Sequence, residues 1–340
     1  MSPMKALVYT APRVVETRVE PDPVPKPGEV VVRVRAAGVC GSDLLGFLGK
    51  SKKRVPPLIL GHEIGGEVAS FGSGVTDLKQ GQRVGIMPLI TCGSCVHCRR
   101  GRNSVCEKRA LLGMTLAGGF AEYTVAPRAC IYPVPESMGF LSASMVECLA
   151  TPVNLFSNHV RGPVSSAAVF GAGTQGLLAL QMAKVSGATQ LFVVDVHESR
   201  LQVAERMGAR PIQAKAGDPV AAILEATGGA GCDVVVDAAG YTPARQQGLK
   251  VTARGGTLAL VGLSDAATEF DVMDIINREI AIHGIYGYAP ADYVRALDLV
   301  SKAQVDVTSW VKEFPLAEGQ RILDQLTTRP GDLVKASLVP

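Results

Sequence analysis

Short runs of β-branched and other apolar residues fill the first third of the chain and alternate with turn-forming residues. They lie at residues 6–9, 14–19, 30–34, 65–71, 83–87 and 120–125. Alternating prolines in residues 21–28 fix φ and favour an extended crossing segment over a helix or a central strand. The pattern predicts a small β domain that carries its functional sites on loops.

From about residue 165 the pattern changes to apolar runs that alternate with segments of helical periodicity. Strands are predicted at residues 167–170, 191–194, 211–213, 233–236, 257–261 and 280–285, and helices at residues 174–186, 199–207 and 292–302. This alternation is typical of a parallel sheet covered on both faces, so we predict an α/β domain with six doubly wound parallel strands. A β-rich tail at residues 332–339 falls outside these six strands and could return to the first domain.

Composition narrows the class of protein. The 340 residues suggest two domains, and 47% hydrophobic with 19% charged residues indicates a globular chain. A net charge of +3 without a long basic run argues against a nucleic-acid partner. Residues 162–183 carry no charge, but Pro163 and several Gly, Ser, Thr and Gln argue against a membrane helix. The N-terminal residues lack an apolar signal segment, so we expect a cytoplasmic protein.

Four of the eight cysteines fall within fifteen residues, in the pattern C-x₂-C-x₂-C-x₇-C. They are Cys92, Cys95, Cys98 and Cys106. Four thiolates close the tetrahedral coordination of Zn²⁺, which predicts a structural zinc that does not touch substrate. An iron–sulfur cluster is the competing interpretation. Cys130 and Cys232 are expected in the core.

A glycine-rich turn follows the first predicted strand of the α/β domain and opens a helix. It reads Gly171-Ala-Gly173-Thr174-Gln175-Gly176. Glycines at these positions allow a pyrophosphate to approach the backbone at the helix N-terminus. Asp195 ends the next strand, where it would accept hydrogen bonds from the ribose hydroxyls and repel a 2′-phosphate, which favours NAD over NADP. Arg200, on the following helix, could weaken that preference.

Two short motifs in the β domain carry further candidate ligands. One contains Cys40, Ser42 and Asp43, and the other contains His62 and Glu63. Cys, His and a carboxylate can form a zinc site with one exchangeable position, and such a site polarises a substrate oxygen.

These motifs occur in an order that resembles the zinc-dependent medium-chain dehydrogenase/reductases, the family of alcohol, polyol and threonine dehydrogenases. Gly118-Gly-Phe-Ala-Glu-Tyr123 completes the match, which covers nearly the whole chain. The resemblance implies a GroES-like catalytic domain (residues 1–150, completed by 287–340) and a Rossmann domain (151–286), with the active site in the cleft between them.

The resemblance also implies roles for individual residues. Cys40 and His62 would bind the catalytic zinc, with Glu63 or Glu147 as the third ligand and Cys148 as a rival. Asp43 would orient His62, with Lys335 as the cationic partner of Asp43. Ser42 would accept the proton of the substrate alcohol before hydride passes to nicotinamide. The position of Thr151 implies a contact to the nicotinamide.

The chain departs from the family pattern after Asp43. Many relatives carry a histidine two residues further on, at the end of a proton relay, where this chain has Leu45. A leucine cannot carry a proton, so we expect the proton to leave through water. The basic segment at residues 50–54 is expected to be a solvated loop.

These inferences lead to an NAD-dependent dehydrogenase of small secondary alcohols or polyols, with two zinc ions per chain. Family habit suggests a homo-oligomer, a dimer or a tetramer. The alternatives are an NADP-dependent carbonyl reductase on the same scaffold and a non-catalytic nucleotide-binding protein. Zinc-free reductases of the same superfamily are disfavoured because they lack both metal motifs.

Overall fold

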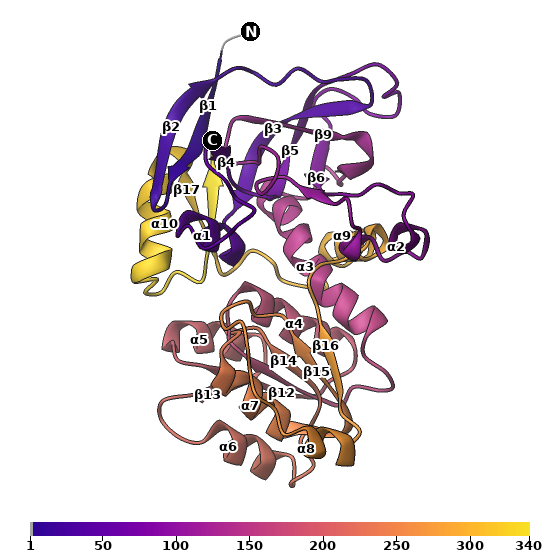
Figure 1. Ribbon diagram of the computed structural model, residues 1–340, viewed down its shortest axis with the longest axis vertical. Helices are drawn as coiled ribbons and strands as arrows, with labels where there is room; N and C mark the ends of the chain where they lie inside the picture. The colour runs from indigo at the N-terminus through magenta and orange to yellow at the C-terminus, as the bar shows by residue number, and fades with distance from the viewer. Residues whose placement is uncertain (1–2) are drawn as a thin grey trace. The chain divides into compact units, whose positions relative to one another are not determined.

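The chain divides into two structural units. The computed structural model describes residues 3–340. The first unit comprises Met1–Glu147, Ala289–Ala303 and Val307–Pro340, and the second comprises Cys148–Tyr288 and Gln304–Asp306 (Figure 1).

An antiparallel-rich sheet forms the frame of the first unit. Its strand order is β10-β6-β5-β3-β18-β17, with β9 also paired to β3. These strands are β3 (Glu29–Gly38), β5 (Glu63–Phe71), β6 (Arg83–Ile86), β9 (Tyr123–Pro127), β10 (Ile131–Pro133), β17 (Val311–Pro315) and β18 (Lys335–Val339). β18 pairs antiparallel with β3 through Ser337 opposite Gly38, which confirms that the tail returns to the first domain.

Smaller sheets complete the first unit. β1 (Met4–Ala11) lies between β2 (Val14–Glu20) and β4 (Leu58–Ile59), and β7 (Leu89–Ile90) pairs with β8 (Ala110–Leu111). The strand predicted at residues 120–125 is displaced to β9. Residues 120 and 121 instead bond to β1, where Leu7 N donates to Phe120 O at 2.8 Å.

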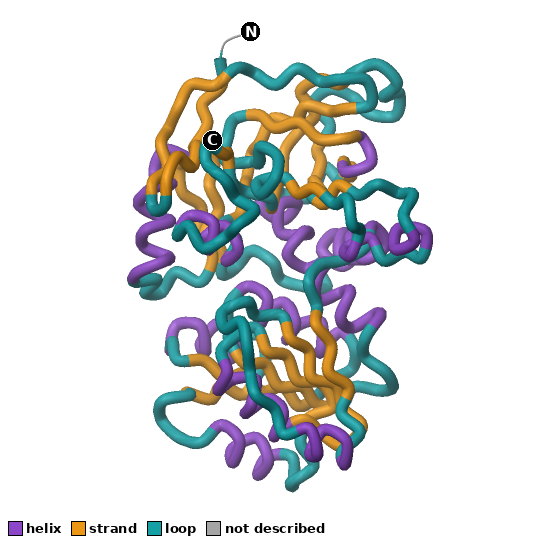
Figure 2. Tube along the Cα trace, viewed as in Figure 1, coloured by secondary structure: helices purple, strands orange, loops and turns teal. Residues whose placement is uncertain are grey.

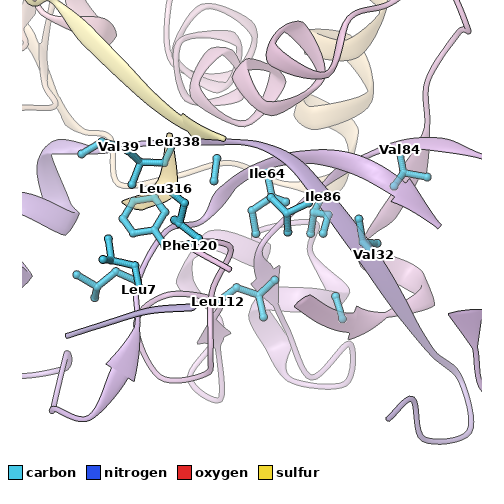
Figure 3. Close-up of a cluster of buried hydrophobic side chains, with 14 of the residues drawn as sticks. Leu7, Val32, Val39, Ile64, Val84, Ile86, Leu112, Phe120, Leu316 and Leu338 are labelled. Carbon is cyan, nitrogen blue, oxygen red and sulfur yellow. The ribbon is translucent and has the colours of Figure 1, made fainter. Parts of the chain in front are cut away.

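One hydrophobic core holds these sheets together. Every second residue of β3 from Val30 to Val34 belongs to this core, as expected for a strand with one face inward. Figure 3 shows Val32 and Ile64 from the large sheet with Phe120 from the loop before β9 and Leu338 from β18. The last strand therefore contributes to packing as well as to the hydrogen bonds of the sheet.

The second unit is built on a parallel sheet. Its order is β13-β12-β11-β14-β15-β16, and each neighbouring pair is parallel, so the predicted six-stranded α/β sheet is confirmed among the described residues. Its strands alternate with helices along the chain, and Figure 2 shows the strands side by side with helices around them. The strands are β11 (Ser166–Phe170), β12 (Gln190–Asp195), β13 (Arg210–Gln213), β14 (Cys232–Asp237), β15 (Thr252–Leu260) and β16 (Ala281–Gly284).

The α-helices include several that the pattern did not predict. Those predicted are α4 (Thr174–Val185), α5 (Glu198–Arg206) and α9 (Pro290–Ser301). The others are α1 (Gly41–Phe47), α2 (Val96–Arg99), α3 (Phe140–Asn158), α6 (Pro219–Ala226), α7 (Thr242–Val251), α8 (Val272–Asn277) and α10 (Gly319–Thr328).

Within residues 3–340, α3 is the one helix long and apolar enough to cross a membrane by length and composition. The share of its apolar window that is buried inside the protein is 61%, as in a core helix. The uncharged residues 162–183, by contrast, form β11, the glycine-rich turn and most of α4.

Candidate functional site

The four clustered cysteines converge around one point. Their Sγ atoms all lie within 4.8 Å of one another. The Sγ of Cys92 lies 3.6 Å from that of Cys106 and 4.0 Å from that of Cys98. A tetrahedral zinc with Zn–S bonds of about 2.3 Å separates its sulfurs by about 3.8 Å, so the four thiols fit one ion. An iron–sulfur cluster spreads its four thiolates over two or four irons, which favours wider separations.

Backbone N–H groups in this loop donate to cysteine sulfurs and so favour the thiolate form that binds a cation. The amides of Cys95 and Cys98 lie 3.4 Å and 3.5 Å from the Sγ atoms of Cys92 and Cys95. Hydrogen bonds from the backbone N–H groups of Cys95 and Ser94 lower the pKa of Cys92 to about 6. Burial raises the pKa of Cys98 to about 11, with further increases from the neighbouring thiols. A bound cation would favour the thiolate form of all four.

A second cluster of potential ligands lies in the same unit. Cys40 precedes α1 and His62 precedes β5, so each side chain sits where the backbone leaves or enters a regular element. Cys40, His62 and Glu63 each offer a ligand atom within 4.8 Å of the other two. The sequence motifs therefore meet in space, although 22 positions separate Cys40 from His62.

Asp43 connects the elements around this cluster. Its Oδ2 accepts from the backbone N of Cys40 at 3.0 Å, and its Oδ1 lies 3.2 Å from Nδ1 of His62. Burial disfavours the charged form of Asp43, but the opposing charge and hydrogen bond of His62 and the charge of Arg54 outweigh it, holding the pKa of Asp43 at about 2. The carboxylate is therefore ionised at neutral pH and fixes the His62 ring so that Nε2 is left for a metal.

The groups around His62 favour its protonated form when no metal is bound. Burial alone would lower its pKa, but the charges of Asp43 and Cys40 and their hydrogen bonds raise it well above the usual value. Metal binding would consequently displace a proton from the ring.

Sequence reasoning missed Arg54. The segment at residues 50–54 was expected to be solvated, and Lys52 and Lys53 are indeed exposed, but Arg54 is buried. Its Nη2 donates to Ser42 Oγ at 3.0 Å and to Asp43 Oδ1 at 3.2 Å. No local pattern distinguishes Arg54 from the lysines before it, because its contacts come from segments distant in sequence.

The predicted partner of Asp43 was wrong. Lys335 does not pair with Asp43; its Nζ donates to Glu63 Oε1 at 2.7 Å and to Val39 O at 2.9 Å. It also lies 2.5 Å from Glu63 Oε2 without hydrogen-bond geometry, and both side chains are buried. The register of β18 against β3 brings Lys335 to this place, and sequence alone does not reveal that register.

Glu63 and Glu147 lie close together. Their carboxylates approach within 4.8 Å, but Glu147 does not share that proximity with both Cys40 and His62. Glu147 is half-buried on α3, and Cys148, next in sequence, is fully buried. The structure thus brings both candidate carboxylates toward the cluster, with Glu63 the nearer to Cys40 and His62.

The glycine-rich turn forms in the second unit as the motif requires. Gly171 has a φ of +99°, and a Cβ at Gly176 would lie 1.8 Å from the Gly171 carbonyl oxygen. Gly173 is the N-cap of α4 and provides no side-chain cap, and a Cβ there would meet nothing within 4 Å. The first N–H groups of α4 have no partner within the helix, and no side chain at Gly173 blocks a pyrophosphate from approaching them.

Asp195 lies at the end of β12 beside this turn. Its Oδ2 accepts from Ala172 N at 2.7 Å and its Oδ1 from His197 N at 2.8 Å. Arg200 Nη1 lies 3.9 Å from Asp195 Oδ2. The carboxylate is held at the place where a ribose would lie next to the pyrophosphate.

The remaining predicted cofactor residues lie on helices of the second unit. Thr174 is the first residue of α4, and Thr151 is buried on α3. The side chain of Gln175 has a structural contact, since its Nε2 donates to Cys148 O at 3.1 Å.

Comparison with known proteins identifies the family. Residues 26–136 match the family described as "Alcohol dehydrogenase GroES-like domain". Residues 176–302 match the family described as "Zinc-binding dehydrogenase". The chain belongs to the zinc-dependent medium-chain dehydrogenase/reductases. This confirms the predicted family and the GroES-like and Rossmann-type folds of this oxidoreductase.

Individual relatives cover nearly all of the dehydrogenase. It is 33% identical over 346 residues to a sorbitol dehydrogenase from Bacillus subtilis (99% of this chain, 97% of the relative). It is 33% identical over 329 residues to an L-threonine 3-dehydrogenase from Bacillus velezensis (94% of each). A solved structure from Sinorhizobium meliloti, described as a zinc-binding dehydrogenase bound to NADP, has a TM-score of 0.92 and 29% identity and covers 100% of both chains.

Proposed function

We propose that this dehydrogenase reversibly oxidises a small secondary alcohol or polyol to a ketone or aldehyde, with NAD as the hydride acceptor. The observation that carries the proposal is the grouping of Cys40, His62 and carboxylates, with the imidazole held by a buried Asp43. Three protein ligands leave one position of a tetrahedral zinc open to substrate. The names of its sorbitol and threonine dehydrogenase relatives fit a substrate that carries hydroxyl groups.

We assign two zinc sites to the chain. The sulfur separations in the four-cysteine loop support a structural ion held by thiolates alone. The second ion would be held by Cys40, His62 and one carboxylate. We assign that carboxylate to Glu147, because Lys335 already neutralises the charge of Glu63; the Glu147 side chain would have to turn toward Cys40 and His62 to bind the ion.

When bound, zinc supplies a Lewis acid that lowers the pKa of a substrate hydroxyl, and NAD supplies a hydride acceptor. Ser42 Oγ accepts the proton that the substrate hydroxyl loses and passes its own proton to water. Asp43 holds Nδ1 of His62 and thereby fixes the ring. Leu45, three residues beyond Ser42 on α1, cannot carry this proton onward.

Asp195 supports NAD as the cofactor because its carboxylate oxygens would accept hydrogen bonds from the two ribose hydroxyls and repel a 2′-phosphate. An NADP-dependent carbonyl reductase is the second candidate. It is favoured by Arg200, whose buried Nε has no hydrogen-bond partner among the described residues, and by the NADP-bound relative. Comparing kcat/KM with NAD and NADP, for the wild type and for Asp195→Ala, separates the two. We expect NAD to be preferred and the variant to lose that preference.

We also propose a cytoplasmic homo-oligomer. β16 lies at the end of the parallel sheet, and α8 exposes Val272, Met273 and Ile276 by 60%, 63% and 59%. A strand at the end of a sheet and a group of exposed apolar side chains are each features that favour pairing with a second copy.

The decisive experiment is a panel of polyols, aliphatic secondary alcohols and amino alcohols, with NADH formation and bound zinc measured together. We expect NADH formation with at least one class and two zinc ions per chain. One zinc per chain with no turnover would instead support a non-catalytic nucleotide-binding protein.

A further inference from the structure

Arg54 is a buried cation in a loop of exposed ones. Its exposed fraction is 4%, whereas Lys52 and Lys53 in the same loop are exposed. Burying a guanidinium is costly unless its N–H groups are paired. Arg54 therefore has to be explained by the groups that it meets.

The surrounding backbone is shaped to admit this side chain. Gly46, inside α1, lies against it, and a Cβ there would be 2.3 Å from Arg54 Cδ. Nε of Arg54 donates to the carbonyl oxygen of Gly113 at 2.9 Å. Any larger residue at position 46 would push the side chain away, so α1 and the loop before β4 are fitted to each other at Arg54.

The two hydrogens of Nη2 go to different groups. One is donated to Asp43 Oδ1 at 3.2 Å and the other to Ser42 Oγ at 3.0 Å. An ion pair alone would need only the carboxylate, which His62 and the backbone of Cys40 also contact. The hydrogen bond to Ser42 does not help to neutralise the charge of Arg54, because the serine hydroxyl is uncharged. This bond therefore points to a role of Arg54 in orienting the hydroxyl.

The direction of this bond is fixed, because a guanidinium can only donate. Ser42 Oγ must therefore accept a hydrogen bond from Arg54, and this bond occupies one of the two lone pairs of Oγ. The other lone pair and the hydroxyl proton remain. Ser42 needs both, because it would take a proton from the substrate on one side and give its own proton up on the other. Without Arg54, the hydroxyl could rotate to donate to Asp43 or elsewhere.

We propose that Arg54 is a positioning residue of the reaction, which orients the Ser42 hydroxyl for proton transfer and holds Asp43 against His62. This inference rests on the role proposed above for Ser42. It places a guanidinium, which carries no proton onward, beside Ser42, in a chain that has Leu45 where many relatives have the relay histidine.

The test compares Arg54→Ala with Lys53→Ala, a matched loss of one cation from the same loop. In the zinc-loaded enzyme, we expect Arg54→Ala to lower kcat about 10- to 100-fold, the usual range for a residue that orients a metal ligand, with the KM for cofactor unchanged. Added guanidinium at concentrations well below those that denature proteins should restore part of kcat. Lys53→Ala should retain the wild-type kcat and show no such effect.

A second readout does not depend on turnover. Because Arg54 supports Asp43 and through it His62, we expect Arg54→Ala to release one zinc to a chelator faster than the wild type, and guanidinium to slow that release. This measurement stays informative even if the wild type oxidises no alcohol, so a failure of the proposed function is distinguishable from a failure of this inference.

Arg54→Lys provides a second test in case Arg54→Ala does not fold, because lysine keeps the positive charge and the approximate length of the side chain. One ammonium cannot reproduce the planar arrangement that reaches Ser42, Asp43 and Gly113 together, so kcat should fall while the fold and zinc content are retained. Wild-type kcat in Arg54→Lys or Arg54→Ala would overturn the proposal. So would a folded Arg54→Ala enzyme whose lost activity guanidinium does not restore.

Discussion

Among single residues, the charged and titratable side chains around the proposed catalytic zinc show what sequence can and cannot assign. The resemblance to the medium-chain dehydrogenases correctly paired Asp43 with His62. The same resemblance assigned Lys335 to the wrong carboxylate, and the run of basic residues at 50–54 wrongly predicted that Arg54 lies in solvent. Both errors concern long side chains. Their partners depend on which segments, far apart in the sequence, the fold brings together, and not on the residues next to them in the sequence.

The two glutamates beside this site can be separated by substitution. We expect Glu147→Gln to reduce zinc from two ions per chain to one, because it removes the proposed third ligand. Glu63→Gln should keep both ions but lower stability by about 3 kcal/mol, because Lys335 is left buried without its partner. Metal analysis and thermal unfolding check both outcomes. If Glu63→Gln loses zinc and Glu147→Gln does not, the ligand assignment is reversed.

Leu45→His tests the interrupted proton relay. Residues 42 and 45 are three apart on α1, so an imidazole at position 45 would lie on the same face as Ser42. With a pKa near 6.5, it would accept protons above about pH 6.5, so we expect kcat to rise there relative to the wild type while KM changes little. A pH profile of kcat identical to that of the wild type would show that Ser42 does not limit proton release.

Among the elements, the six strands of the parallel sheet were predicted well, whereas the longest helix and several short strands of the first unit were not. Continuous apolar strands between helices have a distinctive period, whereas α3 is apolar on most sides and contains Pro152. Proline cannot donate to the carbonyl four residues earlier, which is that of Cys148. The Gln175 side chain donates to this carbonyl instead. The helix therefore depends on a residue of α4, which a local pattern does not reveal.

Gly176→Ala should abolish the close packing of the glycine-rich turn. The added Cβ would lie 1.8 Å from the Gly171 carbonyl oxygen, so the turn must open and the N-terminus of α4 must shift. We expect cofactor affinity to fall at least tenfold, as measured by fluorescence titration with NADH, while zinc content stays constant. Gly217→Ala is the control, because a Cβ at Gly217 meets nothing within 4 Å. Unchanged NADH affinity in Gly176→Ala would contradict a cofactor site at this turn.

The four-cysteine loop should depend on its metal. Cys106→Ser removes one thiolate from the proposed tetrahedron, so we expect one zinc per chain and a lower unfolding temperature. Cys130→Ala, a core cysteine outside the loop, should lose stability without losing zinc. Two zinc ions in Cys106→Ser would show that the loop holds its metal with fewer thiolates or holds none.

For the whole molecule, the question is how many copies assemble. Replacing Met273 and Ile276 with Asp places charge on the exposed apolar face of α8. We expect this double variant to have a lower molecular mass in light scattering than the wild type. Val24→Asp, at an equally exposed apolar position in the first unit, should leave the mass unchanged. A double variant with wild-type mass would place any oligomer interface elsewhere.

The strand that carries Lys335 also has a consequence for biosynthesis. β18 lies between β3 and β17, yet it follows the whole parallel-sheet unit in the chain. During translation, all strands of the second unit are synthesised before β18, the last strand of the first unit. Until that strand emerges from the ribosome, Glu63 lacks its counter-ion and the end of β3 at Ala37 and Gly38 lacks its β18 partner, so the nascent catalytic half is incomplete and open to chaperones.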